Sequence, residues 1–520
     1  MHVPVVFLSF GLFIHTQVLG RMEMAFSPLF QSTDWITLLA ILLPLLLCVG
    51  VLVCCYCGPK TYTIDPVDLQ AVLETKGGGD SSSSRSSSSR NSRGKRSLEI
   101  IVLTIGTRGD VQPFVALCKG LKRAGHRPRI ASHGCFKAWV EGEGIAFKDI
   151  GSERINQPDE WLTAKNIKDF FMAMKPEMVK SKLACEAFYK ESKGMDLILC
   201  TSHTVSFGLD ISEKLALPCY VVKLAPDLPT RAFGPFSKGT SSFGWINLLN
   251  HYSFLVEVGN AYKEAGMDTM EDEFRKNVLG LKDSIGMKRL QLLRDMPTIV
   301  AVGKDIIPDP QWQRNVAVCG WLFLDNEAFS PPPDVVKFLN GPGGPPVCVN
   351  FGSMVLASEA NIILNSVKAA RKLGYRVLLI TGWGKAPECD LFEDADNCML
   401  VKGLPHEWIF PQCRCIVHHG GAGTTARALQ SGVPSVIVPI LKWADQTFWA
   451  RRVEAADCGL HAPDPSQEKL EAAIDMVCTS ASVRRGCEAM KRCVGNETGL
   501  ETAVEMIETA WDWSEQERNA

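Results

Sequence analysis

Short apolar runs that alternate with helical stretches constrain the fold of this chain more than any other feature. The first run, "LEIIVLTIG" at residues 98–106, has the length and continuity of a buried parallel strand. The helical pattern "PFVALCKGLKRAGH" follows directly, with Pro113 near its start and Gly125 at its end, and "RPRIAS" then reads as a second strand. This βαβ unit predicts an α/β fold built on parallel sheets.

The same alternation continues along the chain in two series. Further strand-like runs of the first series are "MDLILCT", "LPCYVVKLA" and "MPTIVAVG", and those of the second are "VCVNFGS", "RVLLITGW", "CMLVKGL", "CRCIVHHGG" and "PSVIVPI". The Pro- and Gly-rich stretch "FSPPPDVVKFLNGPGGPP" separates the two series and reads as a domain linker. A chain of 520 residues with 46% apolar residues can bury two cores. We therefore predict two doubly wound domains that face a ligand-binding cleft.

The N-terminal region has the pattern of a membrane anchor. Residues 1–20 resemble a signal sequence, and residues 35–57 form an uncharged run of about 20 residues, enough to cross a bilayer. More Lys and Arg residues follow this run than precede it, which predicts that the chain crosses the membrane once and that the globular part lies in the cytosol. The membrane would be that of the endoplasmic reticulum or the plasma membrane. The Ser- and Arg-rich tract at residues 77–96 predicts a flexible basic linker.

Charge and cysteine usage exclude several classes of function. A formal net charge of −2 gives no electrostatic reason to expect a nucleic-acid partner. The 19 cysteines are scattered and odd in number, which favours reduced thiols over a disulfide framework. No zinc spacing is present, and the Asp-x-Asp of "EDADN" lies in a polar run that reads as a solvated loop. We expect no metal site.

Two turns with small residues stand at strand ends. In "HHGGAGTT", residues 418–425, the glycines let the backbone approach a ligand, and the helix that follows presents free N–H groups to an anion. The turn "GTRGD", residues 106–110, lacks the spacing of a dinucleotide loop, and neither turn continues as a Gly-Lys-Ser/Thr phosphate loop. The turn "HHGGAGTT" is therefore the candidate phosphate site.

From Leu98 to about residue 505 the chain resembles the UDP-glucose-dependent sterol glucosyltransferases. These enzymes are relatives of the bacterial glycosyltransferases that decorate glycopeptide antibiotics, within the GT-B superfamily of UDP-glycosyltransferases. The resemblance rests on "GTRGDVQPFVALCKGLKRAGHRPRIASH", "PTRAF", "VNFGSM" and the long segment from "LPHEWIFPQCRCIVHHGG" to "ADQTFWARRVE". It implies a GT-B fold: two Rossmann-like domains that face a cleft, here preceded by the N-terminal transmembrane helix.

The resemblance and the composition together divide the chain into seven parts. These are a signal-like segment (1–20), a transmembrane helix (35–57), a flexible linker (58–97), an N-terminal acceptor-binding domain (98–325), an interdomain linker (326–345), a C-terminal UDP-sugar-binding domain (346–505) and a C-terminal tail (506–520).

The resemblance implies an inverting transfer of glucose from UDP-glucose to a lipid hydroxyl, above all the 3-beta-hydroxyl of a sterol. The donor is a substrate, and neither a cofactor nor a metal is expected. The positions that match donor-binding positions of the family are Ser353, Pro405, Trp408, His419, Gly420, Gly421, Gly423, Thr424, Asp445 and Gln446. Among these, His419 and the turn amides would hold the diphosphate, Asp445 and Gln446 the glucose hydroxyls, and Pro405 and Trp408 would lie near uracil.

Two residues of the N-terminal domain match catalytic positions. Asp110 corresponds to the general base that takes the acceptor proton, and the alternative is that its carboxylate caps the following helix. His133 ends the second strand, where it would touch either the acceptor or Asp110. Other functions stay open: transfer to another hydrophobic small molecule, or a catalytically silent protein that binds UDP-sugars or lipids.

Overall fold

The computed structural model describes residues 67–71, 96–151, 164–282, 286–324, 329–352, 360–382 and 390–519. The predicted signal-like segment and the predicted transmembrane helix lie outside these residues. Within the described ranges, no helix combines the length and the apolar character needed to span a bilayer.

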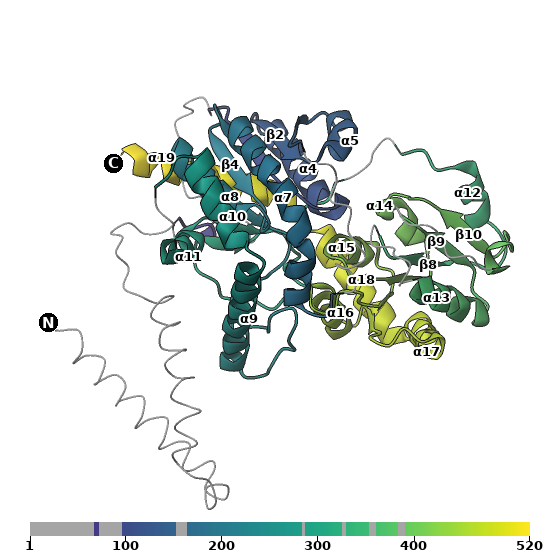
Figure 1. Cartoon of the computed structure of the whole chain (residues 1–520). Helices are drawn as coiled ribbons and strands as arrows, with labels where there is room; N and C mark the ends of the chain where they lie inside the picture. Colours follow the sequence, from purple (N-terminus) through teal and green to yellow (C-terminus); the bar gives the residue numbers. More distant parts are fainter. Residues whose placement is uncertain are drawn as a thin grey trace, which may run out of the picture. The chain divides into compact units, whose positions relative to one another are not determined.

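The first domain is built on a seven-stranded parallel sheet with the strand order β3-β2-β1-β4-β5-β6-β7 (Figure 1). Its strands are β1 (Glu99–Leu103), β2 (Arg127–Ser132), β3 (Ala146–Asp149), β4 (Leu197–Cys200), β5 (Cys219–Lys223), β6 (Thr298–Val300) and β7 (Val316–Val318). Its helices are α4 (Arg108–Arg123), α5 (Lys137–Gly142), α7 (Ile167–Ser192), α8 (Val205–Leu215), α9 (Gly244–Glu264), α10 (Met267–Glu273) and α11 (Gly286–Asp295).

The second domain is built on a six-stranded parallel sheet with the order β10-β9-β8-β11-β12-β13. Its strands are β8 (Val347–Asn350), β9 (Val377–Ile380), β10 (Cys398–Val401), β11 (Cys415–His418), β12 (Ser435–Ile437) and β13 (Gly459–His461). The helices that follow β7 along the chain are α12 (Pro333–Leu339), α13 (Ala360–Lys372), α14 (His406–Ile409), α15 (Ala422–Ser431), α16 (Gln446–Ala455), α17 (Gln467–Thr479), α18 (Ala481–Gly495) and α19 (Gly499–Asn519).

Helices cover both faces of each sheet, which confirms the predicted doubly wound arrangement. Alternate residues of β1 enter two separate cores: Ile100 and Val102 pack with α4, and Ile101 and Leu103 pack with α7 and α8. Because both faces are buried, strands of this kind have to be apolar along their whole length. This requirement explains why the continuous apolar runs of the sequence identified the strands. None of the described cysteines forms a disulfide, in agreement with the reduced thiols expected.

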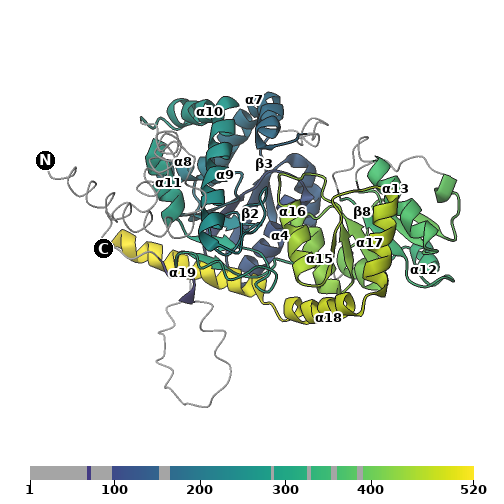
Figure 2. The same cartoon turned by 90° about the horizontal axis from the view of Figure 1, so that it is seen from below.

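The last helix belongs to the first domain, although it follows the second along the chain. Figures 1 and 2 both show α19, in yellow, beside elements of the first sheet. Met506, Ile507, Ala510 and Trp511 are buried in the same core as α4. The boundary predicted at residue 505 and the C-terminal tail predicted for residues 506–520 differ from this arrangement. Residues 506–519 continue the helix α19, which packs on the first sheet.

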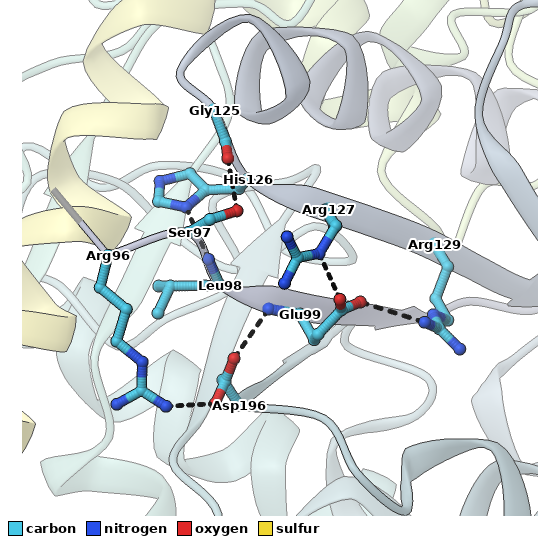
Figure 3. A network of polar contacts seen from close by, with 9 residues as sticks. All are labelled: Arg96, Ser97, Leu98, Glu99, Gly125, His126, Arg127, Arg129 and Asp196. Carbon is cyan, nitrogen blue, oxygen red and sulfur yellow. Dashed lines mark hydrogen bonds and ion pairs between the residues drawn. The ribbon is translucent and has the colours of Figure 1, made fainter.

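Polar contacts fix the amino ends of β1 and β2, at the edge of the sheet away from the predicted ligand site (Figure 3). The Nδ1 atom of His126 accepts a hydrogen bond from the N–H of Leu98, and its Nε2 atom lies 3.0 Å from a carboxylate oxygen of Glu508 in α19. Asp196 accepts from the N–H of Glu99 and pairs with Arg96. His126 is therefore structural, as its position at the end of a helix predicted.

A short piece of the predicted flexible linker is also ordered on the first domain. Val67 and Leu69 are buried in its core, and the N–H of Leu69 donates to the carbonyl of Arg314. The side-chain amide of Gln70 donates to the carbonyls of Trp312, Gln313 and Val316 at 3.1–3.3 Å. We call residues 67–71 the anchor peptide. The linker predicted for residues 58–97 is thus interrupted by a segment that packs on the body.

The packing of α19 predicts a specific loss of stability. Ile507 is fully buried, so Ile507→Ala should cost about 2–5 kcal/mol through lost contacts and a cavity, and should lower the midpoint of thermal unfolding by roughly 5 °C or more. Glu501→Ala is the matched change on the exposed side of α19, where Glu501 only faces Arg123 at 3.9 Å, and should have little effect. Equal midpoints for the two variants in calorimetry would contradict the assignment of α19 to the core.

Candidate active site

The turn after β1 holds Asp110 in a defined position. Gly106 has φ +126°, and a Cβ atom there would lie 2.4 Å from an oxygen of the Asp110 carboxylate, so only glycine fits. Thr107 donates to that oxygen through its N–H at 2.7 Å and its hydroxyl at 2.9 Å. These contacts form a capping box at the start of α4, which confirms the capping alternative. The catalytic role of Asp110 stays a prediction.

His133 lies at the carboxyl end of β2, the strand that pairs with β1. Its side chain is buried, and the preceding strand is tied to the Asp110 turn because the N–H of Thr104 donates to the carbonyl of Ala131. His133 and Asp110 therefore stand at adjacent strand ends, as the sequence pattern indicated. Whether His133 contacts an acceptor stays a prediction.

The turn between β11 and α15 has the geometry of an anion cradle. Gly420 has φ +91°, and a Cβ atom there would lie 2.8 Å from Ile437 and 2.9 Å from the carbonyl of Gln446. The N–H of Gly420 donates to Nδ1 of His418, so this amide already has a partner inside the turn. Gly421, Gly423 and Thr424 stand at the amino end of α15, which has no side-chain cap. An uncapped helix start of this kind favours a negatively charged ligand.

His418 and His419 are both buried but face different surroundings. Burial lowers the pKa of His418 well below its ordinary value, and its Nδ1 atom is used by the Gly420 amide. Burial lowers the pKa of His419 to about 4, so its imidazole is neutral at pH 7. The His419 ring lies where a Cβ on Gly421 or Gly352 would approach it, at 2.5 Å and 3.1 Å respectively. Because these two residues are glycines, there is room for the His419 ring beside the amino end of α15.

Ser353 lies outside the described residues, but the turn that leads to it shows how its neighbours are held. Asn350, the last residue of β8, accepts the N–H of Gly352 at 2.9 Å and contacts Nε2 of His406 at 2.7 Å. The ring of His406 stacks on Phe410 with centroids 4.4 Å apart. Burial, followed by the charge of Arg427, lowers the pKa of His406 to about 3, so its imidazole is neutral at pH 7. Because the Asn350 oxygen already accepts from Gly352, the Asn350 NH2 group faces Nε2 of His406, which accepts from it.

The contact between His406 and Asn350 was not predicted from the sequence. Both lie inside segments that carried the family resemblance, "LPHEW" and "VNFG", but neither residue type signals a partner 56 positions away. The neighbouring Pro405 is the residue before α14, and Trp408 packs against Phe329 with ring centroids 5.3 Å apart. Their predicted position near uracil remains untested.

Asp445 and Gln446 stand at the start of α16. The side-chain oxygen of Gln446 accepts the N–H groups of Ile440 and Leu441, at 2.8 Å and 2.9 Å, and so shapes the loop after β12. One carboxylate oxygen of Asp445 accepts from the indole N–H of Trp449 at 2.9 Å. Burial raises the pKa of Asp445 to about 6, with a smaller upward contribution from the negative charge of Asp110 and an opposing one from the Trp449 hydrogen bond. At pH 7 the Asp445 carboxylate is mostly ionised.

The carboxyl ends of the two sheets meet at this place. The charge of Asp110, from the first domain, acts on Asp445 in the second, and that of Arg108 acts on His406. The loop before Asp445 also contacts the first domain directly: the Trp443 indole N–H donates to the carbonyl of Ala164 at 3.0 Å. The ring of Trp443 lies 4.6 Å from that of Phe170 in α7. The loop before Asp445 therefore lies against the first domain.

The Asp-x-Asp of residues 393–397 is engaged in local structure. Both carboxylate oxygens of Asp394 accept from the Asn397 amide, and one also pairs with Arg371 at 3.2 Å. Within the described ranges, no group of three or more His, Cys, Asp or Glu side chains is arranged to hold a metal ion.

Comparisons with known proteins agree with this geometry. Residues 100–233 match the model of the glycosyltransferase family 28 N-terminal domain, and residues 385–508 match that of the erythromycin biosynthesis protein CIII-like C-terminal domain. The solved glycosyltransferase of kitacinnamycin aligns with a TM-score of 0.59 at 18% identity, covering 80% of this chain and all of the other. The calicheamicin glycosyltransferase CalG4 aligns with a TM-score of 0.56 at 18% identity, covering 81% and 99%. The fold is that of the GT-B glycosyltransferases.

The relatives found by sequence are sterol 3-beta-glucosyltransferases. A sterol 3-beta-glucosyltransferase of Cryptococcus neoformans is 28% identical over 440 residues, which are 79% of this chain and 27% of the relative. One of Arabidopsis thaliana is 29% identical over 430 residues, which are 78% of this chain and 64% of the relative. The chain is a homologue of the sterol 3-beta-glucosyltransferases, which confirms the resemblance. It matches only about a quarter of the length of the fungal relative.

The coupling between the two domains can be tested through the pKa of Asp445. Asp110→Asn removes a negative charge and should lower that pKa below its value of about 6, whereas Trp449→Phe removes a hydrogen bond to the carboxylate and should raise it. Carboxyl 13C NMR of aspartate-labelled protein across the pH range reads both shifts. If the pKa of Asp445 is the same in the wild type and in Asp110→Asn, the two carboxylates do not share a site.

Proposed function

We propose that the protein is an inverting glycosyltransferase that moves glucose from UDP-glucose to a lipid hydroxyl, above all the 3-beta-hydroxyl of a sterol. The observation that carries the proposal is that the two domains meet beside the uncapped start of α15: Gly420 lies against Gln446, and Trp443, two residues before Asp445, donates to Ala164 of the first domain. A reaction between a hydrophobic acceptor and an anionic leaving group needs this arrangement of a base on one side and an anion cradle on the other.

Asp110 supplies the base in this proposal. Its carboxylate accepts the proton of the acceptor hydroxyl while the acceptor oxygen forms a bond to the anomeric carbon of glucose. Thr107 holds one carboxylate oxygen through two hydrogen bonds, which orients the group. His133, at the next strand end, would contact the acceptor or Asp110.

The second domain would hold the donor. The bond between the anomeric carbon and the diphosphate oxygen breaks as UDP leaves with the electron pair, and the negative charge that develops is met by the amides of Gly421, Gly423 and Thr424 at the positive end of α15. The neutral imidazole of His419 donates a hydrogen bond to the diphosphate. Ionised Asp445 accepts from a glucose hydroxyl, and the amide of Gln446 assists while its oxygen keeps the loop in place. Ser353, Pro405 and Trp408 complete the donor site, and no metal takes part.

The proposal includes a membrane anchor at the N-terminus. The uncharged run at residues 35–57 forms a single transmembrane helix, and the excess of cations after it places the two domains in the cytosol. A lipid acceptor is then available in the same membrane. The fungal and plant relatives that carry the name sterol 3-beta-glucosyltransferase support this choice of acceptor.

The direct test is a turnover assay with the purified full chain. UDP release should be seen with UDP-glucose and a sterol, and should depend on the sterol 3-beta-hydroxyl. Release with phenolic or polyketide acceptors alone would favour the alternative acceptor class. If UDP binds but no lipid or small hydroxyl compound is ever glycosylated, the protein is a silent binding protein, which is the second alternative.

Asp110→Asn should reduce turnover on the order of 100- to 10,000-fold, since a general base contributes about that much. UDP affinity measured by calorimetry should stay within about twofold, because Asp110 belongs to the acceptor side. Retained turnover would remove Asp110 from the role of base. A parallel loss of turnover and UDP binding would instead point to misfolding of the capping box.

Gly421→Ala should weaken UDP binding roughly tenfold or more, because the new Cβ would lie 2.5 Å from Nε2 of His419 and displace the ring from the cradle. Gly495→Ala in α18 is the matched control, since a Cβ there meets no atom within 4 Å. Calorimetry with UDP measures both variants. Unchanged affinity in Gly421→Ala would move the diphosphate away from this turn.

A further inference from the structure

The helix α9 exposes several large apolar side chains and buries two polar ones, and its exposed side also carries polar residues such as Ser253, Glu257 and Asn260. Trp245, Leu249 and Val256 are 60%, 39% and 44% exposed, and lie on one face because they are spaced four and seven residues apart. Phe243, just before the helix, is 63% exposed. We call Phe243, Trp245, Leu249, Leu255 and Val256 the α9 face. A helix at the surface of a soluble domain normally shows the opposite distribution.

The polar residues on the other side prevent the helix from turning over. Asn247 is 1% exposed and makes three hydrogen bonds, accepting from the N–H of Ser241 and donating to the carbonyls of Ser241 and Arg231. His251, one turn further, contacts the carbonyl of Phe233 through Nε2 at 2.9 Å. Rotation of α9 would break these buried bonds, at a cost for each group left unsatisfied. The outward position of Trp245 is therefore built into the fold.

A series of contacts links the anchor peptide to α9, and only a short stretch of chain separates the anchor peptide from the predicted membrane span. The uncharged run ends at residue 57 and the anchor peptide begins at Val67, so ten residues reach at most about 35 Å. Gln70 donates to the carbonyl of Trp312, the Trp312 ring lies 6.4 Å from that of Phe233, and Phe233 bonds His251 of α9. A chain of direct contacts thus joins the anchor peptide to α9. Figure 1 shows α9 at the margin of the first domain.

We propose that the α9 face docks on the phospholipid bilayer and inserts its aromatic and aliphatic side chains at the interface. Tryptophan and phenylalanine are suited to that depth, because the headgroup region accepts a large ring and the indole N–H together. Lys263 follows on the same face about two turns beyond Val256, where a cation can reach the headgroups. The exposed Glu257 and Glu264 nearby are paired with Lys238 and Lys168. The face would hold the first domain flat on the leaflet, with the proposed acceptor domain next to the lipid.

Fluorescence quenching by brominated lipid tests this docking without any assay of activity. The full chain is reconstituted in phosphatidylcholine vesicles with plain or brominated acyl chains, and the emission of the wild type is compared with that of Trp245→Phe. The difference isolates Trp245 among the 12 tryptophans. We expect brominated lipid to remove most of the Trp245 emission, and the double change Leu249→Ser with Val256→Ser to reduce this quenching at least twofold.

The matched control replaces three exposed apolar residues on other elements, Leu183, Leu400 and Met476, by serine, and should leave the quenching unchanged. Equal quenching of the wild type and Trp245→Phe would overturn the proposal, since Trp245 would then lie outside the bilayer. Concentration-dependent cross-links between copies through α9, with Trp245 unquenched, would also overturn it and assign the face to a second copy. Because the readout is a lipid contact, loss of the proposed transfer reaction would leave this result unaffected.

Discussion

The apolar contact between the two domains is the constraint on which the site depends. Phe233, from the first domain, packs against Phe448 of α16 with ring centroids 5.4 Å apart, and both belong to one core that also contains β6 and β8. A shared core fixes the relative position of the two sheets at this point. Asp445, three residues before Phe448, therefore stands at a set place relative to the first domain.

The elements that could be predicted from the sequence are those marked by a pattern within a single short stretch of residues. Buried parallel strands need apolar residues on both faces, so β1, β4, β5, β8 and β11 were recognisable as continuous runs. The short strands β3, β7 and β13 carry weaker runs and were not singled out. The position of α19 could not be predicted, because helical periodicity shows which side is apolar but not which core it enters.

The same distinction applies to the site. The glycines of the two turns were informative because positive φ values and close approach leave no other choice, as at Gly106 and Gly420. The sequence does not show which side chains contact each other in the fold. For this reason His406 was not predicted, and the capping contact of Asp110 stayed one of two alternatives. The predicted donor role of Gln446 also gave no hint that its oxygen would hold the loop amides.

The anchor peptide changes the meaning of the Ser- and Arg-rich tract. Both ends of that tract start from the same body: Gln70 is bonded to the first domain on one side, and Arg96 pairs with Asp196 and Glu515 on the other. Residues 72–95 therefore join two points that are both bonded to the first domain. Because closing a longer loop adds only about 0.6 kcal/mol for each doubling of its length, we expect changes in the length of this stretch to have little effect on the stability of the fold.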